Sequence, residues 1–299
     1  MRSKLFVPAS RPTLFGKAMA SQADAISFDL EDAVAVDAKP AARLELAHLL
    51  QGAMVDVSVS ARKTIVVRVN AVNTPHFARD LDAVVWPALQ IINLPMVESA
   101  SMVQQAAEAL IALESVRNIG RSIAILANIE SPRGLRFAAE IASADPRVIG
   151  LQIGYGDLFA PLGIASGQPS ATQYVRTAVR MAAGEAGIDA YDGAYVDFSD
   201  SEGYRLDSMN ARDLGFAGRS CIHPSQVSIA NDVFQPATED VAHALRVVDA
   251  ARYHLAAGVG AFSVDGRLVD GPFITRAQRL VALARRLGMI DESSKRQSD

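Results

Sequence analysis

Cysteine is nearly absent from this chain of 299 residues, which contains only Cys221. A single cysteine can form neither an internal disulfide nor a thiolate zinc site, so the sequence predicts a protein of the reducing cytoplasm. Long apolar runs are missing as well. No stretch reaches the ~18 apolar residues that span a bilayer, and the start MRSKLFVPASRP lacks a signal-peptide core. We therefore expect no membrane partner.

An excess of positive charge is also lacking. Lys and Arg total 29 against 33 Asp and Glu, and no basic stripe is present, so nucleic acid is not expected as a partner. There is no GxSxG elbow and no Walker loop, and Gly154-Tyr155-Gly156 is too weak a signal for a dinucleotide site. With 50% hydrophobic and 21% charged residues, the composition instead predicts a globular protein with a large core.

Apolar runs of strand length recur eight times, with helix-patterned segments between them. The runs cover residues 4–8, 25–30, 64–70, 89–94, 122–129, 148–153, 194–196 and 216–222. Amphipathic helices are expected at 38–50, 99–116, 171–186 and 201–214. Eight strands alternating with crossover helices predict an α/β fold, the (β/α)8 TIM barrel.

The pattern changes after Pro236. Two long helices, at residues 240–257 and 274–287, flank a short strand-like stretch with a turn at Gly266. We therefore expect a TIM-barrel catalytic domain over residues 1–237 and a small C-terminal helical extension, or lid, over 238–299.

Acidic residues gather at the predicted C-terminal ends of the strands, where TIM barrels build their active sites. The polar residues at these ends are Asp29, Glu31, Asp32, Arg68, Asn70, Glu98, Ser99, Glu130, Asp157 and His223. Carboxylates crowded into a barrel mouth repel one another unless a cation or protons neutralise them. Oxygen ligands favour a hard ion, and Mg²⁺ takes one or two carboxylates while leaving positions for water and substrate. Glu130 and Asp157, on neighbouring strands, are the predicted ligands.

Arg68 supplies a cation beside these acids. Its planar guanidinium can bind a substrate carboxylate or a developing oxyanion, so metal and arginine together indicate a site for an α-keto acid. A structural alternative stays open, because an arginine inside VVRVNAV needs a partner and Glu31 or Asp32 could form an ion pair with it. Glu98 could equally be the first-turn acid of the following helix.

A series of motifs resembles the citrate lyase β-subunit-like proteins, or CoA-ester lyases, of the phosphoenolpyruvate/pyruvate TIM-barrel superfamily. In chain order they are RSKLFVPASRP, DAISFDLEDAV, KPAAR, VVRVN, LPMVESA, ILANIESPRGL, IGYGDLF, GFAGRSCIHPSQV and GAFSVDGRLVDGP. The resemblance spans nearly the whole chain. It implies a Mg²⁺-dependent lyase that cleaves or forms a 3-hydroxyacyl-CoA thioester, such as malyl-, citramalyl- or citryl-CoA, with an acetyl-CoA-type ester and a 2-keto acid as the cleavage products.

The resemblance also implies roles for single residues. Glu130 and Asp157 match Mg²⁺ ligands, Arg68 matches a substrate-binding arginine, and Asp270 matches a catalytic acid/base. Residues implied to line the acyl-CoA and substrate site are Phe6, Lys17, Leu30, Glu31, Asp32, Ile222 and His223, with Lys17, Lys39 and Arg43 near the phosphates. In similar proteins the acid at Asp270 lies on a lid that reaches a neighbouring subunit's barrel, which implies a homo-oligomer, a trimer or a multiple of it.

Two positions depart from the family pattern. Ala9 replaces the usual glycine after FVP, and Met96 replaces the usual lysine of the LPKxES motif, which removes a cation beside the acidic mouth.

Three rival functions stay open. They are a citrate lyase β subunit that acts on an acyl-carrier-protein thioester, a malyl-CoA thioesterase, and a non-catalytic scaffold that binds CoA esters.

Overall fold

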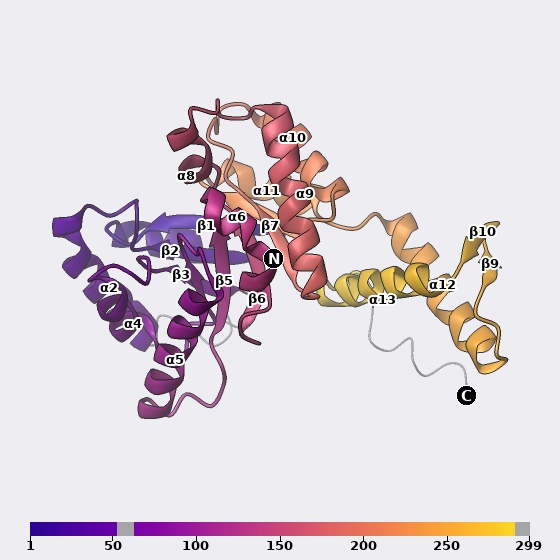
Figure 1. Ribbon diagram of the computed structural model, residues 1–299, viewed down its shortest axis with the longest axis horizontal. Helices are drawn as coiled ribbons and strands as arrows, with labels where there is room; N and C mark the ends of the chain where they lie inside the picture. The colour runs from indigo at the N-terminus through magenta and orange to yellow at the C-terminus, as the bar shows by residue number, and fades with distance from the viewer. Residues whose placement is uncertain (53–62, 291–299) are drawn as a thin grey trace. The chain divides into compact units, whose positions relative to one another are not determined.

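Eight parallel strands form a closed barrel, in which each strand pairs with the next along the chain and β8 pairs with β1 (Figure 1). The strands are β1 (Ser3–Pro8), β2 (Ala25–Asp29), β3 (Thr64–Arg68), β4 (Ile91–Leu94), β5 (Ala124–Ile129), β6 (Val148–Ile153), β7 (Asp189–Asp192) and β8 (Gly218–Cys221). This computed structural model describes residues 1–52 and 63–290. It confirms the predicted (β/α)8 barrel.

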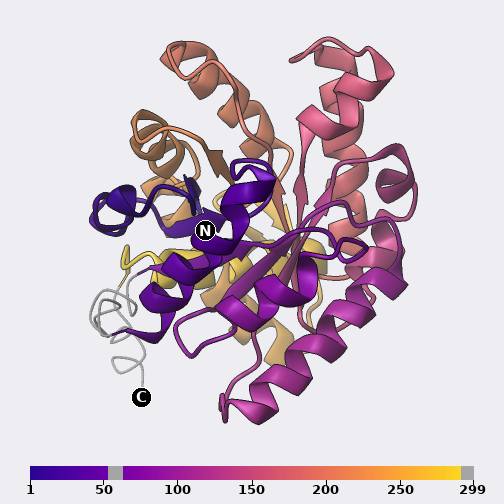
Figure 2. The same ribbon diagram turned by 90° about the vertical axis from the view of Figure 1, so that its left-hand side faces the viewer.

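Helices surround the strands of the barrel, as Figure 2 shows. They are α1 (Phe15–Met19), α2 (Lys39–Gln51), α4 (Phe77–Val84), α5 (Ala100–Val116), α6 (Pro132–Arg136), α7 (Ala138–Ala142), α8 (Tyr155–Phe159), α9 (Pro169–Glu185), α10 (Ser201–Asp213) and α11 (Ser225–Val233). The four long helices expected from periodicity are present, with ends that differ by no more than two residues. Their apolar faces pack with the outward-facing residues of the strands in one large core.

The seventh strand was predicted in the wrong place. A strand was expected at residues 194–196, but β7 is Asp189–Asp192. Asp192 is fully buried, and its carboxylate accepts hydrogen bonds from Arg176 and Tyr155. Because these partners come from other elements, the local pattern could not show that an aspartate belongs to the barrel wall.

The barrel interior changes from apolar to polar along the strands. Alternate residues of a strand face the same side, and one small apolar cluster, separate from the large core, contains Ala25, Val66, Ile91, Leu126 and Tyr191. Two residues further along β2, β3, β4 and β5 lie Ser27, Arg68, Asn93 and Asn128. Polar side chains therefore replace apolar ones toward the C-terminal ends of these four strands.

The chain divides into two compact units, Met1–Phe234 and Gln235–Asp299. The second unit contains α12 (Thr238–Ala256), an antiparallel pair of strands, β9 (Phe262–Val264) and β10 (Arg267–Val269), and α13 (Gly271–Arg286). Its own apolar cluster includes Val247, Phe262 and Val281. Within residues 1–52 and 63–290, no helix has the length and apolar composition needed to cross a membrane.

Candidate active site

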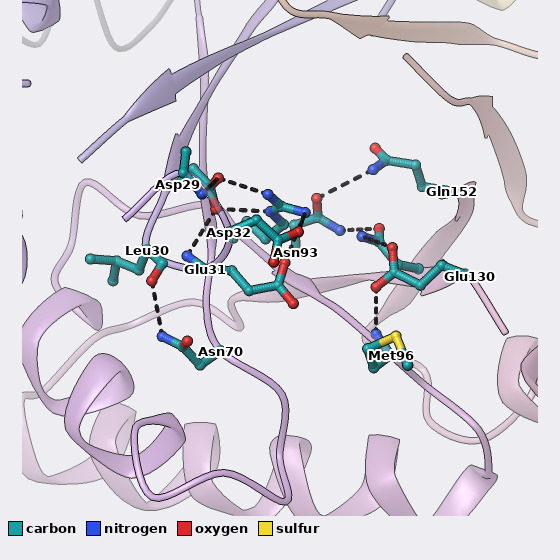
Figure 3. A network of polar contacts seen from close by, with 12 residues as sticks. Asp29, Leu30, Glu31, Asp32, Asn70, Asn93, Met96, Glu130 and Gln152 are labelled. Atoms are coloured by element: carbon teal, nitrogen blue, oxygen red, sulfur yellow. Dashed lines mark hydrogen bonds and ion pairs between the residues drawn. The ribbon is translucent and has the colours of Figure 1, made fainter. Parts of the chain in front are cut away.

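Arg68 is held at the end of β3 by an acid of the neighbouring strand. Its Nε donates to Asp29 Oδ1 at 2.8 Å and its Nη2 to Asp29 Oδ2 at 2.7 Å. The Nη1 atom lies 2.8 Å from Glu31 Oε2 and 3.4 Å from Asp32 Oδ2 (Figure 3). The structure thus contains the ion pairs left open by the sequence, and adds Asp29 as the bidentate partner. The guanidinium edge that carries Nη1 faces the acids of the loop after β2.

That loop is fixed by hydrogen bonds to its main chain. Asp29 accepts from the Glu31 N–H at 3.0 Å, and Lys39 Nζ donates to the carbonyl oxygens of Leu30 and Glu31 at 2.7 and 2.8 Å. Lys39 is therefore engaged within the fold, where it fixes the main chain of this loop. Leu30 is fully buried, so its side chain supports the loop and offers no accessible surface.

Arg43 is likewise engaged within the fold. Its Nη1 donates to Asp80 Oδ1 at 3.0 Å, and Asp80 is fully buried. Asp80 also accepts from the main-chain N–H and the side-chain Nδ2 of Asn70, at 2.8 and 2.6 Å. Arg43 therefore completes the hydrogen bonding of a buried carboxylate.

Glu130 follows β5 and is buried, with 1% of its surface exposed. Its Oε1 accepts from the Met96 N–H at 2.6 Å, and its Oε2 accepts from Asn128 Nδ2 at 3.2 Å. Met96 has a φ of 50°, a left-handed conformation that is uncommon outside glycine. The residue that stands in place of the usual lysine thus directs its main-chain N–H at Glu130.

Three carboxyl groups of the cluster have raised pKa values. Burial raises the pKa of Glu130 to about 6, with a contribution from the charge of Asp157, and raises the pKa of Glu31 to about 8. Asp157, in the first turn of α8 after β6, has a raised pKa because of partial desolvation and the charge of Asp32. Burial is the main cause of all three shifts, and the charges of neighbouring acids add to it.

This donor set fits a hard divalent cation. Among the described residues, no group of three or more His, Cys, Asp or Glu side chains could hold a metal ion by itself. Glu130 and Asp157 instead provide two carboxylates whose charges act on each other across neighbouring strand ends. Mg²⁺ is typically held by one or two carboxylates and completes its shell with water and substrate oxygens. The residues present therefore match the predicted ion.

Of the other expected site residues, one borders the charged cluster and three are exposed. The Phe6 ring on β1 has its centroid 5.3 Å from Arg68 Cζ, so it borders the charged group. Ile222 and His223 follow β8 and are exposed, and the His223 ring stacks on Phe198 with centroids 5.0 Å apart. Lys17 is exposed on α1, where its amine has no hydrogen bond or ion pair with the described residues.

Asp270 belongs to the second unit. It is half-buried at the N-cap of α13, where its side chain makes no capping hydrogen bond. Its Oδ1 has no hydrogen-bond partner among the residues that the structure describes. Helix capping therefore does not account for an aspartate at this position.

Sequence reasoning missed several polar residues inside the barrel. Lys4, Asn93, Asn128 and Gln152 are all buried. Each interrupts an apolar strand, and Asn128 and Gln152 stand two residues before Glu130 and Gly154. Polar residues at alternate positions of an apolar strand were the available signal, because such positions share one face of the strand.

Comparison with known proteins gives consistent results. A model of the HpcH/HpaI aldolase/citrate lyase family matches residues 2–224. The chain is 35% identical to citrate lyase subunit beta of Escherichia coli, over 97% of this chain and 95% of that protein. It is 33% identical to L-malyl-CoA/beta-methylmalyl-CoA lyase of Rhodobacter capsulatus, over 95% of this chain and 94% of that protein.

A solved structure agrees with these relatives. CitE of Mycobacterium tuberculosis, in complex with magnesium, acetoacetate and coenzyme A, matches with a TM-score of 0.72 and 35% identity, over 96% of this chain and 100% of that chain. The named relatives are lyases, as the resemblance implied. The fold, the order of motifs and these matches lead to one conclusion: the chain belongs to the HpcH/HpaI aldolase/citrate lyase family.

Proposed function

We propose that the protein is a Mg²⁺-dependent carbon–carbon lyase acting on a 3-hydroxyacyl-CoA thioester such as malyl-, citramalyl- or citryl-CoA. The reaction releases an acetyl-CoA-type ester and a 2-keto acid, or joins them in reverse. The observation that carries the proposal is the barrel mouth, where Arg68 and the buried Glu130 lie among acids whose pKa values are raised. A relative named as a malyl-CoA lyase, and a CitE structure holding magnesium and coenzyme A, support it.

In the cleavage direction, the substrate hydroxyl loses its proton, the carbon–carbon bond breaks, and the resulting thioester enolate is protonated. Glu130 and Asp157 would hold Mg²⁺, which supplies a Lewis acid for the carboxylate and carbonyl oxygens of the keto acid. Arg68 would offset the developing negative charge through its Nη1 edge. Asp29 would act as its positioning residue, because the bidentate pair fixes the plane of the guanidinium.

Asp270 would exchange the proton at the acetyl carbon. Its role in this proposal is supported by the carboxylate oxygen that has no hydrogen-bond partner among the described residues. We further propose that the unit carrying Asp270 serves the barrel of a neighbouring subunit, in a homotrimer or a multiple of it. The chain is proposed to work in the cytoplasm, where its one cysteine, which is buried and free, would stay reduced.

The test is the release of keto acid from malyl-CoA, citramalyl-CoA and citryl-CoA, first with Mg²⁺ and then with EDTA, while free CoA thiol is measured separately. Keto acid that depends on the metal and appears without free thiol is the expected result, and it identifies the substrate. Thiol without keto acid would instead identify a thioesterase. If neither product forms, the same thioesters on an acyl-carrier protein distinguish a citrate lyase β subunit from a non-catalytic scaffold.

A further inference from the structure

A polar layer crosses the barrel interior one step below Glu130. Lys4 Nζ on β1 donates to Asn93 Oδ1 on β4 at 2.8 Å, and Gln152 Nε2 on β6 lies 3.5 Å from the same oxygen. None of these three strands is adjacent to another of them in the barrel. Side chains from non-adjacent strands meet only across the interior, so this layer fills the barrel below its mouth. All three residues are at least 97% buried.

The layer is connected to the proposed metal ligand. Asn93 Nδ2 donates to Asn128 Oδ1 at 2.6 Å, and Asn128 Nδ2 donates to Glu130 Oε2 at 3.2 Å. Figure 3 shows the contacts that run from Gln152 through Asn93 toward Glu130. A continuous path of hydrogen bonds therefore joins the Lys4 amine to the Glu130 carboxylate, and every donor along it points toward Glu130.

The partners of Asn93 fix this direction. Its oxygen accepts from Lys4 Nζ. The Asn93 amide nitrogen also donates to the Leu126 carbonyl at 3.0 Å, which favours the same orientation. Asn128 then receives a donor at its oxygen and presents its own N–H to Glu130. A reversed path would place the Asn128 oxygen against a carboxylate, with two acceptors in contact.

We propose that Lys4 is a positioning residue for Glu130, acting through Asn93 and Asn128. The proposal rests on the proposed function, since it takes Glu130 as a ligand of Mg²⁺. Lys4 Nζ holds the Asn93 oxygen, and the Asn93 nitrogen holds the Asn128 oxygen. Asn128 is thereby oriented with its N–H on the ligand oxygen of Glu130.

Two variants test this proposal. The direction of their change in Mg²⁺ affinity distinguishes an effect on the orientation of Glu130 from an effect of charge alone. Lys4→Met removes the first donor of the path, and Asn93→Asp adds a negative charge that can accept from Lys4 but cannot donate to Asn128. Through Coulomb interactions alone, neither change would weaken Mg²⁺ binding. Through orientation both should weaken it, by about 10- to 100-fold, as is typical when a partner of a metal ligand is lost.

The measurement is the Kd for Mg²⁺ by calorimetry at neutral pH, together with thermal unfolding without metal. Gln152→Met is the matched control, because Gln152 lies in the same layer but not between Lys4 and Glu130. Its Kd should stay within about twofold of wild type, even where its Tm changes. If Lys4→Met does not fold, Asn93→Asp decides the question, since the new ion pair maintains the packing of the layer.

The outcomes separate the two proposals. If the wild-type protein binds Mg²⁺ and both variants bind it equally well or more tightly, the role of Lys4 is wrong and the proposed function stands. If the wild-type protein binds no Mg²⁺, both proposals fail. Weaker binding by Lys4→Met or Asn93→Asp, with Gln152→Met unchanged, supports the positioning role.

Discussion

Gly154 offers a direct test of how closely the site is packed around Glu130. A Cβ atom added at this position would lie 2.2 Å from Glu130 Oε2 and 2.6 Å from Glu130 Cβ. Rotation of the carboxylate cannot relieve the second overlap, so Gly154→Ala must push the two strand ends apart. Glu130 would then lose the hydrogen bond from the Met96 N–H, now 2.6 Å long.

The size of the effect follows from that hydrogen bond. A hydrogen bond to a charged group contributes about 1.5–3 kcal/mol, which corresponds to a loss of about ten- to a hundredfold in Mg²⁺ affinity. Overpacking is expected to destabilise the fold by about 1–3 kcal/mol as well. Calorimetric titration with Mg²⁺ and a urea unfolding curve measure the two effects separately.

Gly156→Ala is the matched control, because a Cβ at that position would meet nothing within 4 Å and the residue lies in the short helix α8. It should bind Mg²⁺ like the wild-type protein. Wild-type affinity in Gly154→Ala would refute the argument, because it would show that the carboxylate of Glu130 is not needed in its present position.

Three further predictions concern single acids. Glu130→Ala should abolish keto-acid release while circular dichroism shows an intact fold; retained activity would disprove its assignment as a ligand. Asp270→Asn should abolish release but keep the wild-type Kd for Mg²⁺, so weaker metal binding would argue against a role in proton transfer alone. Burial raises the pKa of Asp207, but the hydrogen bond from Arg176 and the charge of Arg219 outweigh it and hold that pKa below its usual value. Because the folded-state pKa is lowered, the stabilisation is present above about pH 4 and is lost as the pH falls through the folded-state pKa. Urea midpoints measured down the acid range should show this loss, and Asp207→Asn should reduce it.

The barrel could be predicted because its strands and helices differ in local periodicity. The exception was β7, where two aspartates, Asp189 and Asp192, obscure the strand pattern. Asp189 is exposed, and the buried Asp192 pairs with Arg176 and Arg219, which belong to other elements. A pattern within one segment cannot reveal a partner that arrives from another.

The charged residues of the site could also be predicted, but their pairing could not. The sequence placed Arg68 among acids, yet it did not indicate that Asp29 takes the bidentate fork. Nor did it indicate that Lys39 donates to two carbonyl oxygens of the loop after β2. Both pairings depend on which side chains meet after the strands close, and this information is not contained in the spacing of motifs.

The charges at the barrel mouth also set an order of binding. Asp29 and Arg68 neutralise each other, so Glu31, Asp32, Glu130 and Asp157 determine the local charge. A keto-acid carboxylate entering alone would add negative charge to a site where burial and neighbouring acids already disfavour the charged form of a carboxyl group. Mg²⁺ entering first offsets negative charge there and offers coordination positions for the keto acid. Calorimetry should therefore detect pyruvate binding only weakly without Mg²⁺, and Mg²⁺ binding without pyruvate. Equal affinity for pyruvate with and without the metal would show that Arg68 alone holds the carboxylate.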